Sequence, residues 1–151
     1  MTFKSLKLTD KFIWVLCVLS IALGFLLYVL CRDENLFLFK WLKYFGAQNG
    51  ILKMRKCYSL PLPEWMYYSL PYGLWNFSLG TALIAVWSRK LTFMTKCFIL
   101  SAVFVSGVLI EVMQALHIVR GTFDVVDLII LIFSFAFVIL ILNIKSNEKS
   151  I

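Results

Sequence analysis

Four long apolar runs constrain this chain more than any other feature of its sequence. The first, from Phe12 to Leu30, contains no charged residue, and a helix needs about 20 such residues to cross roughly 30 Å of bilayer hydrocarbon. The others span residues 71–87, 97–118 and 125–142. No run alternates with the period of two that a β-barrel strand requires. The sequence therefore predicts an all-α membrane protein: one domain, residues 1–151, with a bundle of about four transmembrane helices.

Composition and charge placement refine this prediction. Hydrophobic residues make up 62% of the 151 and charged residues 15%, a balance that excludes a soluble domain of this size. The first run is too long for a signal peptide and lacks a cleavage pattern, so we expect a retained anchor. On the side of both termini lie eight basic residues: Lys4, Lys7, Lys11, Arg89, Lys90, Lys96, Lys145 and Lys149. The opposite side has seven: Arg32, Lys40, Lys43, Lys53, Arg55, Lys56 and Arg120. The positive-inside rule thus favours cytoplasmic termini, with the loop 32–70 and the Arg120 turn outside.

The long first loop is too apolar to be a solvated linker. A helix over residues 36–45 would place Lys40 and Lys43 on one edge and aromatic or aliphatic side chains around the rest. Such an amphipathic segment suits the headgroup layer, either as a lid that gathers lipid or as a loop packed on the bundle. Cys31 and Cys57 fall on this same side, and the sequence leaves open whether they are free thiols or a disulfide.

Polar residues gather where a membrane helix should have none, late in the third run and in the turn that follows: Glu111, Gln114, His117, Arg120, Asp124 and Asp127. Glu111 and Gln114 share a helix face, and Gly107, one turn before Glu111, leaves room for a neighbouring helix. An ionised carboxylate about 10 Å inside the helix end costs about 2.5 to 3.5 kcal/mol. We therefore expect Glu111 to be protonated or paired, with Arg120 as its main partner and His117 as a weaker one.

The two aspartates have a structural interpretation beside the functional one. Asp124 is placed to cap the fourth helix, and Asp127 falls in its first turn, where the helix dipole favours a carboxylate. The cluster as a whole is then either a binding site or an ion-pair lock between the last two long helices. No cofactor is expected, although Asp124 and Asp127 offer a pair of oxygen ligands for a divalent metal.

The motif in this region resembles that of a known family. Glu111 to Gln114 followed by Arg120 to Asp127 is similar to the VanZ-like family of small bacterial membrane proteins, in which E-x-x-Q precedes an arginine and two aspartates. The segment Leu70 to Trp75 resembles the start of the family's second helix. Many members carry Asn and Gly after the second aspartate, whereas Leu128 to Ser134 contains neither. The resemblance implies a multi-pass protein of the bacterial inner membrane and an association with resistance to glycopeptide antibiotics.

Three functions follow as hypotheses. The first is a binding protein, not an enzyme, whose outer-leaflet pocket holds a lipid headgroup, a lipid-linked cell-wall precursor or an antibiotic, with Arg120 on an anionic group and the other cluster residues as hydrogen-bonding partners. The second is an enzyme acting on a lipid-linked phosphate or glycan, with Glu111 and Asp127 as catalytic candidates. The third is a proton or ion path through Glu111. Membrane lipids are the expected partners, nucleic acid is not, and the oligomeric state is left open.

Overall fold

The structure is a computed structural model that describes residues 10–32, 37–57, 62–87 and 91–147. Over these residues the chain forms seven helices and no strand. They are α1 (Asp10–Cys31), α2 (Phe37–Tyr44), α3 (Gln48–Cys57), α4 (Glu64–Tyr68), α5 (Leu70–Val86), α6 (Phe93–Ala115) and α7 (Val125–Asn147). The prediction of an all-helical chain is confirmed for this part of the protein.

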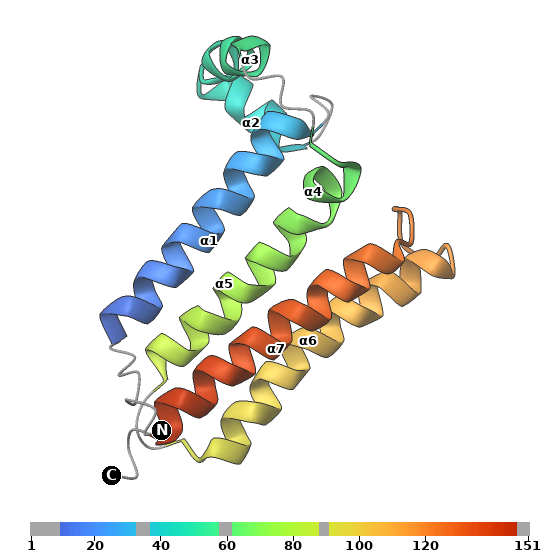
Figure 1. Cartoon of the computed structure of the whole chain (residues 1–151). Helices are drawn as coiled ribbons and strands as arrows, with labels where there is room; N and C mark the ends of the chain where they lie inside the picture. The colour runs from blue at the N-terminus through green and yellow to red at the C-terminus, as the bar shows by residue number, and fades with distance from the viewer. Residues whose placement is uncertain (1–9, 33–36, 58–61, 88–90, 148–151) are drawn as a thin grey trace.

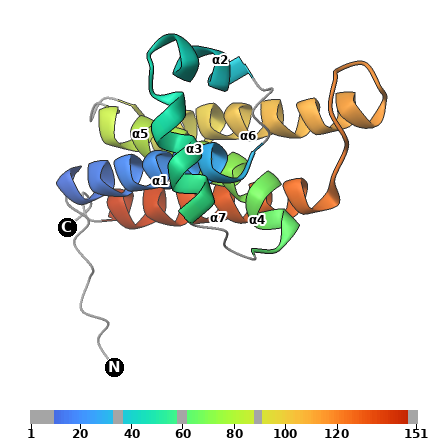
Figure 2. The ribbon, with the colours of Figure 1, turned by 90° about the horizontal axis from the view of Figure 1, so that it is seen from above.

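The four long helices, α1, α5, α6 and α7, run side by side and alternate in direction (Figure 1). Helix α5 contacts α1 on one side and α7 on the other, and α6 packs mainly on α7. The three short helices lie at the end of the bundle where α1 ends and α5 begins (Figures 1 and 2). The turn between α6 and α7 lies at that same end. The long loop and the Arg120 turn therefore share one end, as the predicted topology requires.

Three helices are long and apolar enough to cross a membrane: α1, α6 and α7, the last over Val125–Ser146. Many of their apolar side chains point outward, for example Phe98 at 76% and Phe133 at 61% exposure, as expected where lipid replaces water. Helix α5 is apolar but has 17 residues, about 26 Å of helix. The membrane class is supported by these three helices, and the count of four spans stays a prediction.

Helix α6 differs at both ends from the predicted range 97–118. It begins earlier because Thr92 caps it, its hydroxyl accepting a hydrogen bond from the Thr95 N–H at 3.2 Å. It ends at Ala115 because His117 adopts a left-handed φ of 57°, while its N–H bonds back to the carbonyl of Gln114. This is the backbone conformation that commonly ends a helix. The predicted range was therefore wrong at its C-terminal end by about one turn.

Helices α5 and α7 approach closely through glycines. A Cβ atom at Gly80 would lie 2.7 Å from both γ-carbons of Val138, and a Cβ at Gly73 would overlap Ile130. The Ser134 hydroxyl donates a hydrogen bond of 2.8 Å to the carbonyl of Gly73. Small residues and interhelical hydrogen bonds are the usual means of helix association in lipid. This contact fixes the register of α5 against α7, and hence the position of the site described below.

The first loop contains more helix than the sequence predicted. Helix α2 falls within the predicted range 36–45, but α3 and α4 were not expected. Helix α4 begins after Pro63 and passes through Ser69 into α5, where Pro71 occupies the first turn at no cost in backbone hydrogen bonds. Cys31 is a free thiol, and the side chain of Cys57 lies outside the described residues. Of the residues used in the charge count, Lys4, Lys7, Arg89, Lys90 and Lys149 also lie outside them.

Candidate functional site

Glu111 is the most deeply buried residue of the predicted cluster. Its side chain is 3% exposed and lies four residues before the end of α6, about 6 Å along the axis, which corrects the predicted depth of about 10 Å. The carboxylate accepts a hydrogen bond from the backbone of Asp124. Its second oxygen, Oε2, is buried without a hydrogen-bond partner among the described residues. A buried carboxylate oxygen in this state is costly unless something binds it.

The side chain that packs against Gly107 is Tyr72 of α5. A Cβ atom at Gly107 would lie 2.9 Å from the Tyr72 hydroxyl, so the missing side chain is what lets the phenol enter the helix contact. The hydroxyl is buried without a hydrogen-bond partner in the described part of the chain. The Asn76 side chain, one turn further along α5, lies close to it and donates a hydrogen bond of 3.2 Å to the Tyr72 carbonyl.

Asp127 of α7 completes this group. It lies in the first turn of α7, and its N–H bonds to the carbonyl of Asp124 at 3.1 Å. Its Oδ1 is buried and unpartnered within the described residues, and its carboxylate is close enough to Glu111 and Tyr72 to interact with both electrostatically. We call Tyr72, Glu111 and Asp127 the acidic cluster. Three helices thus contribute two carboxylates and one phenol to a buried position.

Asp124 caps α7, as its structural interpretation predicted. Its Oδ1 accepts a hydrogen bond of 2.8 Å from the Val126 N–H, which satisfies one of the free amides at the start of the helix. Its backbone bonds to both Glu111 and Asp127. The residue therefore positions the two carboxylates of the acidic cluster, and its own side chain is engaged by the cap.

Arg120 and His117 do not join the acidic cluster. Both side chains are exposed in the turn between α6 and α7, and no ion pair joins Arg120 to a carboxylate in the described ranges. The predicted Arg120–Glu111 pair is therefore absent, because α6 ends at Ala115 and the turn carries the arginine away. Gln114 is half-buried against the turn: a Cβ at Gly121 would lie 2.6 Å from its Nε2. The sequence predicted a cation beside Glu111, and the structure has the Tyr72 phenol there instead.

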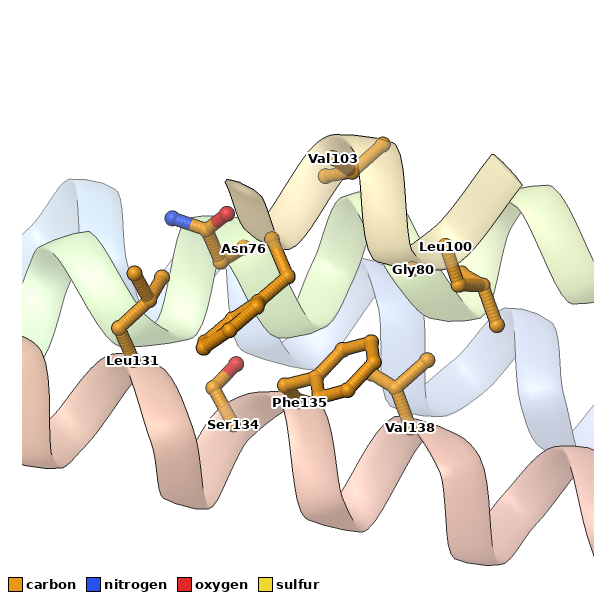
Figure 3. Close-up of a pocket in the computed structure, with 9 residues that line it drawn as sticks. Asn76, Gly80, Leu100, Val103, Leu131, Ser134, Phe135 and Val138 are labelled. Carbon is orange, nitrogen blue, oxygen red and sulfur yellow. The ribbon is translucent and has the colours of Figure 1, made fainter. Parts of the chain in front are cut away.

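A small cavity lies next to Asn76, between α5, α6 and α7 (Figure 3). It has about 20 Å³ of space for water, enough for one molecule. Asn76 and Ser134 are the polar side chains of its lining, and Gly80, Leu100, Val103, Phe104, Leu131, Phe135 and Val138 supply the rest. Leu100 and Val138 also belong to the apolar core, together with Ile13, Ile84 and Leu142. At the junction of α5, α6 and α7, polar groups thus extend from the acidic cluster for about two turns, to Asn76 and Ser134.

Two further observations bear on ligands. Among the described residues, no group of three or more His, Cys, Asp or Glu side chains is arranged to hold a metal ion. A groove of about 490 Å³ runs along the other face of the α5–α7 contact, lined by apolar side chains such as Trp65, Phe77 and Phe133. None of the acidic cluster lines this groove. The cluster is therefore a site of the α5–α6–α7 junction alone.

Comparison with known proteins identifies no relative: no family model, no curated protein and no solved structure matches the chain. The resemblance to the VanZ-like family stays a prediction that rests on the motif from Glu111 to Asp127.

Proposed function

We propose that this chain is a VanZ-like integral membrane protein of the bacterial inner membrane that binds the polar head of an amphiphile at the acidic cluster. The ligand classes are a lipid headgroup, a lipid-linked cell-wall precursor or a glycopeptide-type antibiotic. One observation carries the proposal: Tyr72, Glu111 and Asp127 each hold a buried oxygen without a partner among the described residues, and they meet from three helices. Such unsatisfied groups are rare in folded proteins and need a reason.

The chemistry of the cluster narrows the ligand. Two carboxylates repel each other in a buried site, and a positive charge or several hydrogen-bond donors would relieve that repulsion. We therefore expect the bound head to carry an ammonium, amide or hydroxyl group. Arg120 and His117 lie exposed at the adjacent turn, where they are free to contact an anionic part of the same ligand. In this proposal Arg120 lies at the rim of the site, whereas the sequence predicted it at the centre.

The extent of the polar groups favours binding over transport. They reach from Glu111 through Asn76 to Ser134, and the same helices then meet through Ile84, Leu100 and Val138. A site that ends in packed side chains suits a bound head, whereas a proton or ion path needs polar groups across the membrane.

A ligand-retention experiment tests the proposal. Wild type, Glu111→Gln and Asp127→Asn are purified, and co-purifying amphiphiles are measured by mass spectrometry. Since a hydrogen bond to a charged group contributes about 1.5 to 3 kcal/mol, each change should lower retention at least about tenfold. The matched control is Glu64→Gln, which makes the same chemical change at an exposed carboxylate of α4. Thermal unfolding of all four proteins shows whether the variants are folded; folded variants that retain the wild-type lipids would contradict the proposal.

An enzyme is the second candidate, and one observation favours it. Glu111 and Asp127 are close enough to interact electrostatically, and the Tyr72 phenol lies at the contact of α5 with α6. Together they are a set of groups able to move a proton. Such an enzyme would act on a lipid-linked phosphate or glycan. In cells that carry Glu111→Gln, an enzyme predicts that one lipid-linked species accumulates and another disappears. A binding protein predicts the same lipid composition as in wild-type cells, with less of one lipid bound to the protein.

A further inference from the structure

Helix α2 has one buried side and one exposed side. Phe39 is 2% exposed and lies beneath the guanidinium of Arg55, 4.7 Å from its ring centre. The opposite side carries Trp41 at 50%, Tyr44 at 83% and, just after the helix, Phe45 at 70% exposure. Phe45 contacts the other two rings: Trp41 stacks on it, and Tyr44 meets it edge to face. An exposed group of aromatic rings on one helix marks an interaction surface.

The segment that contains α2 and α3 is positively charged. Residues 37–57 contain five basic residues and no acidic one: Lys40, Lys43, Lys53, Arg55 and Lys56. Lys40 and Lys43 are exposed on α2, and Lys40 lines a hollow of about 370 Å³ with Trp41 and Tyr44. We call Lys40, Trp41, Lys43 and Tyr44 the α2 face. It combines cations with aromatic rings. This combination suits the surface of an anionic bilayer, where charged headgroups lie above hydrocarbon.

The position of the α2 face is also defined. Arg55 donates hydrogen bonds to the carbonyls of Val29 and Arg32 at the C-terminal end of α1, where a cation is favoured by the helix dipole. This contact holds α2 and α3 at the level at which α1 ends. Figure 1 shows both short helices beyond the end of α1, at the end of the bundle that also holds the turn between α6 and α7. In a bilayer that contains α1, they lie at the level at which this helix leaves the hydrocarbon.

We propose that the α2 face binds anionic phospholipids of the outer leaflet, with Lys40 and Lys43 on the phosphates and Trp41 and Tyr44 between the headgroups. The occupant is the bilayer surface, because the face combines two exposed lysines on a segment, residues 37–57, that has no acidic residue, exposed aromatic rings and a position at the end of a membrane helix. Lysines near an anionic surface contribute about 1 kcal/mol each, so the two together predict a preference for anionic over zwitterionic lipid of about thirtyfold. This surface is separate from the acidic cluster and does not depend on its ligand.

Lipid competition at Trp41 tests the proposal. The full chain is reconstituted in brominated phosphatidylcholine, which quenches tryptophan fluorescence, and unbrominated phosphatidylglycerol is added. The signal of Trp41 is the difference between wild type and Trp41→Phe. We expect phosphatidylglycerol to displace the quencher from Trp41 at a lower mole fraction than added unbrominated phosphatidylcholine does, and high salt to weaken this preference.

Charge variants decide whether the lysines are the cause. Lys40→Gln with Lys43→Gln should abolish the preference at Trp41. The matched control, Lys11→Gln with Lys96→Gln, removes the same charge at the other end of the bundle and should leave it unchanged. Equal displacement by the two lipids in wild type would overturn the proposal, as would an equal loss in the control. A Trp41 signal that neither lipid nor quencher changes would show that the face lies outside the bilayer surface, and would also overturn the proposal.

Discussion

At the scale of single residues, burial separates the two kinds of charge in this chain. Glu111 and Asp127 have oxygens inside the bundle, whereas Arg120, three residues after His117, stays exposed. A carboxyl group can become neutral by taking up a proton, but a guanidinium keeps its charge under all conditions. Hydration therefore holds the arginine in the turn while the carboxyl groups remain within the bundle. The pairing predicted from sequence proximity omitted this difference.

The contact between Gly107 and Tyr72 gives a prediction at the same scale. Gly107→Ala would bring a methyl group within about 3 Å of both the Tyr72 hydroxyl and a methyl group of Leu131. We expect a loss of about 1 to 3 kcal/mol in the free energy of unfolding, measured by thermal or denaturant unfolding in detergent. Tyr72→Phe removes the crowded oxygen, so the double variant should recover part of this loss, with a coupling energy of about 1 kcal/mol.

The control for this cycle is Gly50→Ala on α3, where an added Cβ meets no atom within 4 Å. Alanine in an exposed helix favours folding, so this change should leave stability unchanged or raise it. Strict additivity of Gly107→Ala and Tyr72→Phe would show that the phenol does not occupy the space above Gly107.

At the scale of helices, the sequence predicts those elements whose signal is local. The apolar runs predicted the bounds of α1, α6 and α7 to within about five residues. A helix that faces lipid needs a continuous run of apolar residues, and such a run can be seen in the sequence. The end of α6 was predicted wrongly because it depends on the left-handed backbone conformation of His117. Glycine usually marks such a conformation in a sequence, and this position holds a histidine. Helix α3 was missed because it is short and polar, with Asn49 and Gly50 near its start.

The candidate site shows the same limit. The carboxylates and Gly107 were found because polar or small residues in an apolar run are conspicuous. Tyr72 was missed as a site residue because an aromatic ring at a helix start also suits a membrane interface. Which ring faces Gly107 of α6 depends on how α5 packs against both α6 and α7. Gly73 and Gly80 set the α5–α7 part of this packing through contacts distant in sequence.

Arg55 provides the prediction at the scale of helices. Its guanidinium caps the end of α1 and covers Phe39, so it joins α3 to both α1 and α2. Arg55→Gln should loosen α2 and α3 while the long helices stay packed. Hydrogen–deuterium exchange should therefore rise across residues 37–57 and not in α5 or α7.

Lys53→Gln is the control for this change, since Lys53 is an exposed cation on the same helix and its loss should leave exchange near the wild-type level. If Arg55→Gln exchanged as slowly as wild type, the two short helices would be held by other contacts.

At the scale of the whole molecule, the two ends of the bundle differ in kind. At one end Lys145 of α7 forms an ion pair of 2.7 Å with Asp10 of α1 and donates a hydrogen bond of 2.9 Å to the carbonyl of Ile84 in α5. This links three of the long helices at the end of the bundle where α1 begins and α7 ends (Figure 1). The other end holds the short helices and the acidic cluster. The bundle is thus joined by an ion pair at one end and has buried polar groups at the other.

We expect the end with Lys96 to be cytoplasmic and the end with Arg120 to be outside, because basic residues near short loops favour the cytoplasmic side. In a variant without native cysteines, Arg120→Cys should react with a membrane-impermeant maleimide in intact cells, since residue 120 is exposed. Lys96→Cys should react only after the membrane is permeabilised. The reverse pattern would turn the acidic cluster toward the cytoplasm and exclude ligands of the outer leaflet, and labelling of both sites in intact cells would contradict a bundle that spans the membrane with alternating helices.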